Sequence, residues 1–100
     1  MECRACFLEE LERVIEERLR ERPEGSYTAL IAERGVPYAA RKLGEEAAEA
    51  IVEALAGSRE RLAEEAADLL FHLLVLLRLR GLRLADVVEV LEGRAGWRRK

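Results

Sequence analysis

Five acidic side chains in the middle of the chain are the residues best suited to chemistry. Glu45, Glu46 and Glu49 form one group, and Glu65 and Asp68 form a second group after an interval of 15 residues. Because an α-helix turns by about 100° per residue, side chains three or four positions apart share a face. Glu46 is therefore paired with Glu49, and Glu65 with Asp68. Carboxylate oxygens bind hard cations, and magnesium is typically held by carboxylates together with substrate phosphates.

The sequence around these acids predicts an all-α fold. Apolar residues recur at helical spacing, and Gly, Pro and Ser interrupt the pattern where helices are expected to start or stop. The predicted helices run from about Cys3 to Arg22, from Tyr27 to Arg34, from Pro37 to Ala56, from the cap Ser58 to Arg80 and from Ala85 to Glu92. At 100 residues, the chain fits a single domain spanning residues 1–100.

The two long helices are expected to pack as an antiparallel hairpin, because only Gly57 and Ser58 connect them. Each acid pair flanks an apolar stripe. The stripes consist of Leu43, Ala47, Ala50, Ile51 and Ala54 on one helix and of Leu62, Ala66, Leu69 and Leu73 on the other. The hairpin can thus bring the acid pairs face to face, where like charges need a cation between them or raise each other's pKa. The alternative is a solvated glutamate face, which is the usual arrangement of such runs.

Four more polar side chains are candidates for contact with a bound molecule. Lys42 can contact a phosphate or pair with Glu46, which lies one turn further along the same helix. His72 follows the second acid pair by one turn in an apolar run, where a histidine is usually a hydrogen-bonded core residue, although a substrate contact is also open to it. Ser26 and Thr28 can serve as helix caps or belong to a loop that closes over a substrate.

Composition excludes several classes of protein. A net charge of −3 argues against a nucleic-acid-binding protein. The apolar run Leu69–Leu77 is too short for a membrane span, which needs roughly 20 residues. The N-terminus shows no basic segment followed by an apolar one, so a cytoplasmic location is expected. The segment Trp97–Lys100 is locally basic and can hold an anionic group or remain a solvated tail.

Cys3 and Cys6 form one Cys-x-x-Cys pair. A structural zinc site needs four ligands, so the pair is half a site. A redox motif of this spacing is expected beside a βαβ pattern, which the sequence lacks. We therefore predict that the two cysteines are small helix residues without a chemical role. The alternative is a four-thiolate site that two copies of the chain form together.

The run Leu69–Leu77 also predicts a dimer. It is apolar at every position but His72, and a helix that is apolar on all sides must be covered on all sides. A chain of this length buries only a limited fraction of its surface, whereas association would bury more. We therefore expect a homodimer of packed helices.

The motifs in combination resemble a known family. They are Ser26-Tyr27-Thr28, Glu45-Glu46-x-x-Glu49, Glu65-x-x-Asp68 and the following Leu69-Leu70-Phe71-His72-Leu73. This set resembles the all-α nucleoside triphosphate pyrophosphohydrolases, the MazG-like superfamily, and within it the phosphoribosyl-ATP pyrophosphohydrolases. The likeness covers about residues 7 to 95. One departure is Phe71, where the family often has tyrosine.

The resemblance implies an enzyme of histidine biosynthesis that hydrolyses phosphoribosyl-ATP to phosphoribosyl-AMP and pyrophosphate. It also implies Mg²⁺ bound by Glu46, Glu49, Glu65 and Asp68, with Glu45 orienting or deprotonating the attacking water or binding a further ion. Phosphoribosyl-AMP would then pass to a cyclohydrolase, which is a possible functional partner. Two alternatives stay open: a house-cleaning hydrolase of non-standard nucleotides from the same superfamily, and a non-catalytic helical dimer whose acids are solvated.

Overall fold

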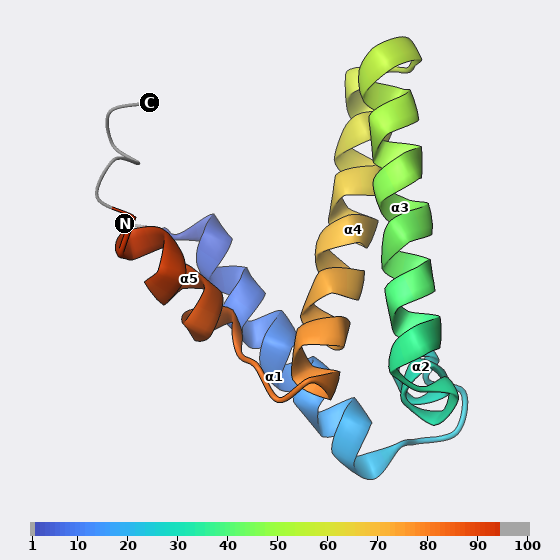
Figure 1. The fold of residues 1–100 in the computed structure, drawn as a ribbon, viewed down its shortest axis with the longest axis vertical. Coiled ribbons are helices and arrows are strands. Elements are labelled where there is room, and N and C mark those ends of the chain that lie inside the picture. The colour runs from blue at the N-terminus through green and yellow to red at the C-terminus, as the bar shows by residue number, and fades with distance from the viewer. Residues whose placement is uncertain (1, 95–100) are drawn as a thin grey trace.

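A computed structural model describes residues 2–94, which contain helices and no strand (Figure 1). The elements are η1 (Arg4–Cys6), α1 (Phe7–Glu21), α2 (Tyr27–Arg34), α3 (Val36–Ala56), α4 (Arg59–Leu79) and α5 (Leu84–Glu92). The predicted all-α fold is confirmed, and the predicted helices differ from the observed ones by a few residues at their ends. The basic segment at residues 97–100 lies outside the described residues.

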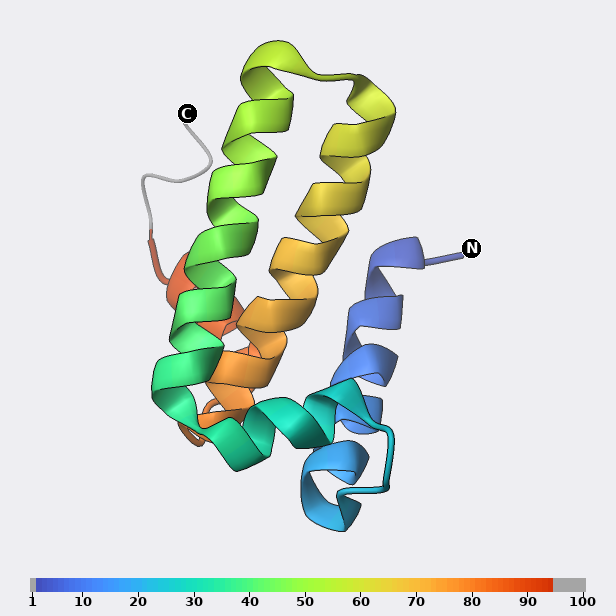
Figure 2. The same ribbon diagram turned by 90° about the vertical axis from the view of Figure 1, so that its right-hand side faces the viewer.

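Helices α3 and α4 form the predicted antiparallel hairpin, joined at one end by a short turn (Figure 2). Ser58 ends this turn and caps α4, because its Oγ accepts a hydrogen bond from the backbone N–H of Arg61 at 3.1 Å. Such a cap satisfies one of the donors that the first turn of a helix leaves without a partner. The hairpin therefore fixes which residues of α3 face which residues of α4.

Helix α2 lies across the base of the hairpin and leads directly into α3 (Figure 2). Ser26 caps it by accepting a hydrogen bond from the backbone N–H of Ala29 at 3.2 Å. The sharp change of direction into α3 takes place at Gly35, whose φ of 88° suits glycine and few other residues. Pro37, which was predicted to be the first residue of this helix, is its second residue, and in the first turn its missing N–H costs no hydrogen bond.

The core lies where α1, α2, α3 and α4 meet at the base of the hairpin. Its buried residues are Ile15, Ile31, Ala39, Leu74 and Val75. Leu8, Leu11, Leu19 and Phe71 are among the half-buried side chains that pack around them. Among the described residues, only the lower half of the hairpin takes part in this core, and its other end stands away from α1, α2 and α5 (Figure 1).

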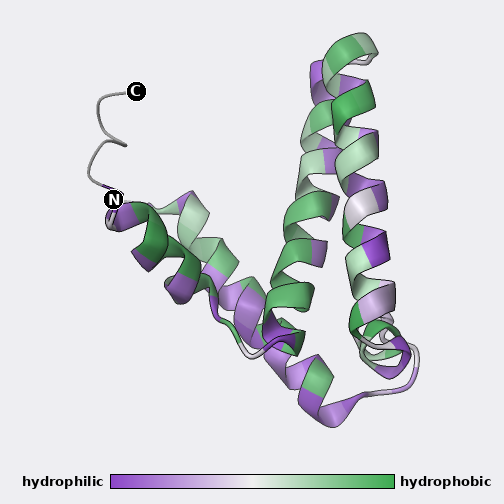
Figure 3. Cartoon of the chain, in the orientation of Figure 1, coloured by the Kyte–Doolittle hydropathy of each residue, from purple (hydrophilic) through white to green (hydrophobic). Residues whose placement is uncertain are grey.

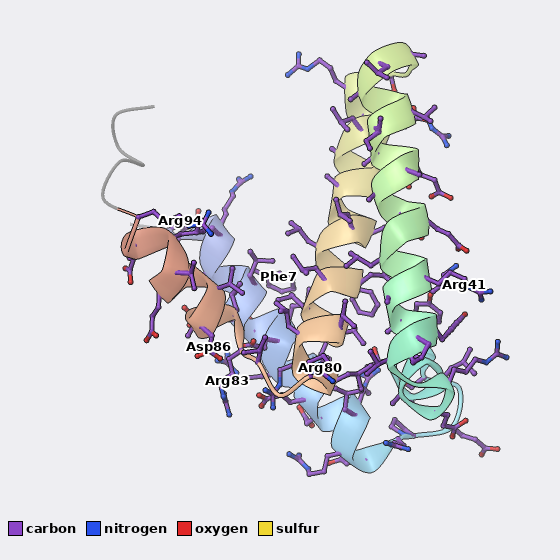
Figure 4. The ribbon with its side chains drawn as sticks, in the orientation of Figure 1. Phe7, Arg41, Arg80, Arg83, Asp86 and Arg94 are labelled. Atoms are coloured by element: carbon purple, nitrogen blue, oxygen red, sulfur yellow. A yellow bond between two sulfur atoms is a disulfide. The ribbon has the colours of Figure 1, made fainter. Side chains whose placement is uncertain are left out.

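Two acids of α1 hold the end of α4 and the start of α5. Glu16 forms ion pairs with Arg78, at 3.1 Å, and with Arg83, at 3.4 Å. Glu12 accepts a hydrogen bond from the backbone N–H of Leu84 at 2.6 Å. Figure 4 labels Arg83 at this junction, from which α5 runs beside α1. These polar contacts fix the direction in which α5 leaves the hairpin.

Several apolar side chains of the hairpin and of α5 are exposed in the single chain. Ile51, predicted to belong to the core stripe of α3, is 60% exposed, and Leu55 is 83% exposed. The stripe prediction was wrong at Ile51 and at Ala54, which is also exposed, because no element within residues 2–94 covers the upper part of the hairpin. Figure 3 shows hydrophobic residues along much of α4 and on α5. None of the helices within residues 2–94 is both long and apolar enough to cross a membrane.

Cys3 and Cys6 form a disulfide, which corrects the prediction that they are helix residues without chemistry. Cys3 precedes the short 3-10 helix in extended backbone, so the regular helix predicted from Cys3 begins only at Phe7. This local geometry places the two Cα atoms 5.3 Å apart, within the range that a disulfide bridges. Sulfurs joined in this way cannot act as the thiolate ligands of a four-cysteine site.

We expect the disulfide to contribute little to the stability of the fold. In the chain-entropy account, closing so short a loop contributes at most about 2 kcal/mol. Both cysteines are also exposed, at the N-terminal end of the chain. Replacing Cys3 and Cys6 with serine should therefore lower the free energy of unfolding, measured by urea denaturation, by no more than that amount. A variant that is unfolded in the absence of urea would show that the disulfide holds more than its own loop.

Candidate active site

Three of the predicted acids converge where α3 and α4 face each other. Glu46 and Glu49 come from α3 and Glu65 comes from α4, and one carboxylate oxygen of each lies within 4.8 Å of the other two. The helical spacing puts Glu46 and Glu49 on adjacent turns, and the antiparallel hairpin brings Glu65 to them. The sequence thus predicted both the residues of this acid cluster and the packing that assembles it.

The acid cluster is electrostatically unfavourable when nothing is bound. Burial, reinforced by the neighbouring Glu49, raises the pKa of Glu46 above its usual value. A hydrogen bond with Glu49, together with burial and the surrounding acids, raises the pKa of Glu65. One oxygen of Glu46 and one of Glu65 are buried and have no hydrogen-bond partner among residues 2–94. Buried carboxylate oxygens without donors usually signal a missing partner.

The residues present fit a hard divalent cation as that partner. Such ions take carboxylate oxygens as ligands, and a cation would at once satisfy the two orphaned oxygens and offset the repulsion between the acids. The small side chains Ala47, Ala48 and Ala66 beside the cluster leave space for water or ligand. A solvated glutamate face would leave no buried oxygen of this kind, so the cluster differs from an ordinary charged surface.

Asp68, the fourth predicted metal ligand, is not part of the group defined by those distances. Its side chain is exposed on α4. Its charge nevertheless acts on the cluster, because it contributes to the raised pKa values of Glu46 and Glu65. Asp68 therefore lies beside the three converging acids, and a role as ligand remains a proposal.

A cavity of about 350 Å³ lies next to the cluster. It is lined by Ala48, Glu49, Val52, Glu53, Arg61 and Glu65. The guanidinium of Arg61 lies 3.6 Å from the carboxylate of Glu53; the arginine side chain is largely exposed, whereas that of Glu53 is 18% exposed. Sequence spacing did not single out Arg61, because it belongs to no acid motif and reaches the cavity only through the packing of the hairpin.

Lys42 pairs with Glu45 and not with Glu46, which corrects one of the two predictions for this lysine. The Lys42 ammonium lies 3.1 Å from a Glu45 oxygen, and the Arg41 guanidinium lies 3.7 Å from the other. The Glu46 side chain is turned toward Glu49 and α4, so Glu45 is the acid that remains beside Lys42. Contact between Lys42 and a phosphate remains a proposal.

His72 is 6% exposed and is hydrogen-bonded through both ring nitrogens. Its Nδ1 lies 2.7 Å from the backbone oxygen of Asp68, and its Nε2 lies 2.9 Å from the hydroxyl of Tyr27. Because a carbonyl only accepts, Nδ1 carries the proton and Nε2 accepts from Tyr27. The tyrosine in turn lies near Lys42, and burial raises its pKa. The sequence motif includes Tyr27, but the pairing of Tyr27 with His72 could not be predicted because the two residues are 45 positions apart.

Ser26 and Thr28 occupy different environments. The Ser26 hydroxyl is used as the cap of α2, and Ser26 also lines a cavity of about 490 Å³ formed by the loop before α2 and by α2 itself. Thr28 is buried and does not line that cavity. Of the two predicted substrate contacts, only Ser26 therefore borders a space that a ligand could enter from solvent, and both roles remain proposals.

The fold and the acid cluster define the class of all-α proteins that carry a carboxylate site between two antiparallel helices. Comparison with known sequences makes the assignment more specific. The profile of the phosphoribosyl-ATP pyrophosphohydrolase family matches residues 8–95. The chain belongs to this family.

Individual relatives agree with the family assignment. A protein of Pyrobaculum arsenaticum named phosphoribosyl-ATP pyrophosphatase is 58% identical over 94 residues, which cover 94% of this chain and 98% of the relative. A protein of Ignicoccus hospitalis with the same name is 53% identical over 89 residues, covering 89% of this chain and 87% of the relative. The histidine biosynthesis bifunctional protein HisIE of Xylella fastidiosa is 50% identical over 88 residues, covering 88% of this chain and 43% of that longer protein.

Proposed function

We propose that this protein hydrolyses phosphoribosyl-ATP to phosphoribosyl-AMP and pyrophosphate, the second step of histidine biosynthesis. The observation that carries the proposal is the convergence of Glu46, Glu49 and Glu65 in a chain of the phosphoribosyl-ATP pyrophosphohydrolase family. Hydrolysis of the bond between the α- and β-phosphates of the substrate needs charge neutralisation and a positioned water more than a protein nucleophile. An acid cluster with orphaned oxygens, beside a cavity that includes an arginine, suits that requirement.

Magnesium is the proposed cofactor, held by the acid cluster with Asp68 as a further ligand. When bound, it would neutralise phosphate charge, lower the pKa of a water and stabilise the departing pyrophosphate. The protein's own side chains would act around it. Glu45 lies one position before Glu46 and is proposed to orient the attacking water or accept its proton. Lys42 and Arg61 are proposed to contact phosphate oxygens, as cationic side chains do.

Identification of the products tests the reaction directly. Phosphoribosyl-ATP incubated with the protein and Mg²⁺ should yield phosphoribosyl-AMP and pyrophosphate in equal amounts, separated by anion-exchange chromatography. Release of inorganic phosphate and a nucleoside diphosphate would place the cleavage at the wrong bond. No turnover would favour the non-catalytic helical dimer.

Without a bound metal, the stability of the protein should fall as pH rises. The raised pKa values of Glu46 and Glu65 mean that the folded protein binds protons more tightly than the unfolded chain. Their contribution to stability is therefore complete below the ordinary value of 4.5 and is lost as pH rises through the raised values. In EDTA, the melting temperature should fall over this range.

Added Mg²⁺ should oppose that loss, because the ion binds the deprotonated carboxylates. At a free concentration of about 100 times its Kd, binding adds about 2.7 kcal/mol, which corresponds to a rise on the order of 10 °C for a domain of this size. Thermal melts from pH 4 to pH 8 with EDTA or Mg²⁺ measure both effects. Equal melting temperatures in EDTA and Mg²⁺ at pH 8 would argue against a magnesium site.

A homodimer is part of the same proposal. The exposed side chains of Ile51, Val52 and Leu55 lie on the upper hairpin, and Leu70 lies on α4. A helix-packed dimer would bury such exposed apolar side chains, which in groups mark protein-binding surfaces. We expect light scattering to give twice the 11.3 kDa mass of the chain. Ile51→Glu should shift the protein toward the monomer, whereas a wild-type mass of 11.3 kDa at micromolar concentration would rule out the dimer.

The product defines a functional partner. Phosphoribosyl-AMP is the substrate of a cyclohydrolase, so we propose a functional link between this protein and such an enzyme. The bifunctional name of the Xylella fastidiosa relative, which is about twice as long as the matched region, supports this link for the family. A cytoplasmic location belongs to the proposal because the substrate is made from ATP.

A further inference from the structure

Two arginines lie over the ring of Tyr38 near the start of α3. The guanidinium carbon of Arg34, from the last turn of α2, is 5.1 Å from the ring centroid, and that of Arg41, from α3, is 5.2 Å away. Both distances fall within the range of a cation–π contact, which is about 6 Å. Both guanidinium carbons therefore lie about 5 Å from the same ring centroid, so they are no more than about 10 Å apart. We call these three residues the arginine–tyrosine cluster.

The cluster retains the capacity to bind an anion. None of the ion pairs within residues 2–94 involves Arg34. Arg41 forms one ion pair, with Glu45 at 3.7 Å. The side chains of both residues are exposed, so this ion pair is weak. A guanidinium group matches the geometry of a phosphate group, to which it can donate two parallel hydrogen bonds. In a chain with a net charge of −3, two arginines beside one ring give this part of the surface a local positive charge.

The cluster and the acids lie along the same side of α3. Tyr38 and Glu49 are 11 positions apart, which amounts to three helical turns and about 20° of rotation, with a rise of about 16 Å. Figure 4 shows Arg41 projecting from α3 on the side away from α1 and α5. A long ligand can thus extend along α3 from the acids to the cluster.

We propose that the arginine–tyrosine cluster binds the terminal phosphate of the phosphoribosyl group of the substrate. This inference rests on the proposed function. Phosphoribosyl-ATP carries anionic groups at two ends, the triphosphate and the phosphate of the second ribose. With the triphosphate at the acid cluster, the second phosphate needs a cationic partner further along the same surface. ATP lacks this phosphate, so the cluster selects phosphoribosyl-ATP over ordinary nucleoside triphosphates.

Steady-state kinetics of Arg34→Gln tests the inference, because Arg34 contacts none of the proposed catalytic acids. The substrates are phosphoribosyl-ATP and ribosyl-ATP, in which a hydroxyl replaces the terminal phosphate. Loss of one charge-assisted contact should raise KM for phosphoribosyl-ATP about tenfold with kcat unchanged. KM for ribosyl-ATP should be the same in Arg34→Gln and in the wild type. Arg41→Gln should also raise KM for phosphoribosyl-ATP, and its kcat is expected to fall as well because Arg41 pairs with the proposed catalytic residue Glu45. Arg59→Gln, at the other end of the hairpin, should change neither constant.

Two results would overturn the inference alone. If Arg34→Gln and Arg41→Gln leave KM for phosphoribosyl-ATP unchanged in an active protein, the cluster does not bind the substrate. If both substrates lose affinity equally, the arginines act on a part that the two share, such as the triphosphate. Failure of the wild type to hydrolyse phosphoribosyl-ATP is a separate result, which overturns the proposed function and the inference with it.

Discussion

Glu46→Gln should abolish most of the magnesium-dependent activity while leaving the fold intact. The glutamine keeps the shape of the side chain but removes the charge that a cation needs. Loss of several kcal/mol of transition-state stabilisation by the metal corresponds to a decrease in kcat/KM of at least about a hundredfold. In EDTA, however, the variant should melt at the same temperature as the wild type or higher, because one of the mutually repelling acids is gone.

Glu64→Gln is the matched control. Glu64 is exposed on α4, directly before Glu65, and is not one of the three converging acids. Its replacement should leave kcat/KM and the response to Mg²⁺ unchanged. Equal activities for Glu46→Gln and Glu64→Gln would contradict the metal site. A Glu46→Gln variant that unfolds in EDTA would indicate that Glu46 supports the fold and not a cation.

Ile31→Ala should lower the free energy of unfolding by about 2 to 5 kcal/mol. Ile31 is 0% exposed and belongs to the core where α2 meets the hairpin. Truncation removes buried methyl groups and leaves a cavity that the neighbours fill only in part. Because α2 carries Tyr27, loosening this helix should also weaken the contact between Tyr27 and His72. Urea denaturation gives the loss of free energy, and kcat/KM gives its consequence for activity.

Leu55→Ala provides the comparison at an exposed position of the hairpin. In the single chain its side chain is 83% exposed, so in the Ile51→Glu background, which is expected to be monomeric, the substitution should change the free energy of unfolding by less than about 0.5 kcal/mol. If Ile31→Ala destabilises the protein no more than Leu55→Ala does, the core described above does not hold α2 in place.

The fold could be predicted from the sequence because its elements are defined by local signals. Ser26 and Ser58 mark helix starts, and the two-residue connection at Gly57 and Ser58 permits only an antiparallel hairpin. The placement of α1 and α5 could not be predicted, since it depends on contacts between distant positions. The ion pair between Glu16 and Arg78 is an example.

The acid cluster was predictable for a similar reason. Glu46 and Glu49 share a helix face by spacing, and the hairpin brings Glu65 opposite them. Which acid a side chain pairs with on one helix face was less predictable. Lys42 has both Glu45 and Glu46 within reach, and the packing of Glu46 against α4 leaves Glu45 as its partner. The disulfide between Cys3 and Cys6 was missed because it depends on a local departure from the α-helix.

The most direct test of the central claim compares substrates in a magnesium-dependent assay of pyrophosphate release. Phosphoribosyl-ATP is measured beside ATP, the other ordinary nucleoside triphosphates and a set of modified ones, each with Mg²⁺ and with EDTA. The account predicts turnover of phosphoribosyl-ATP only, dependent on Mg²⁺. Turnover of the ordinary or modified triphosphates in preference to phosphoribosyl-ATP would contradict it and would assign the protein to the house-cleaning hydrolases.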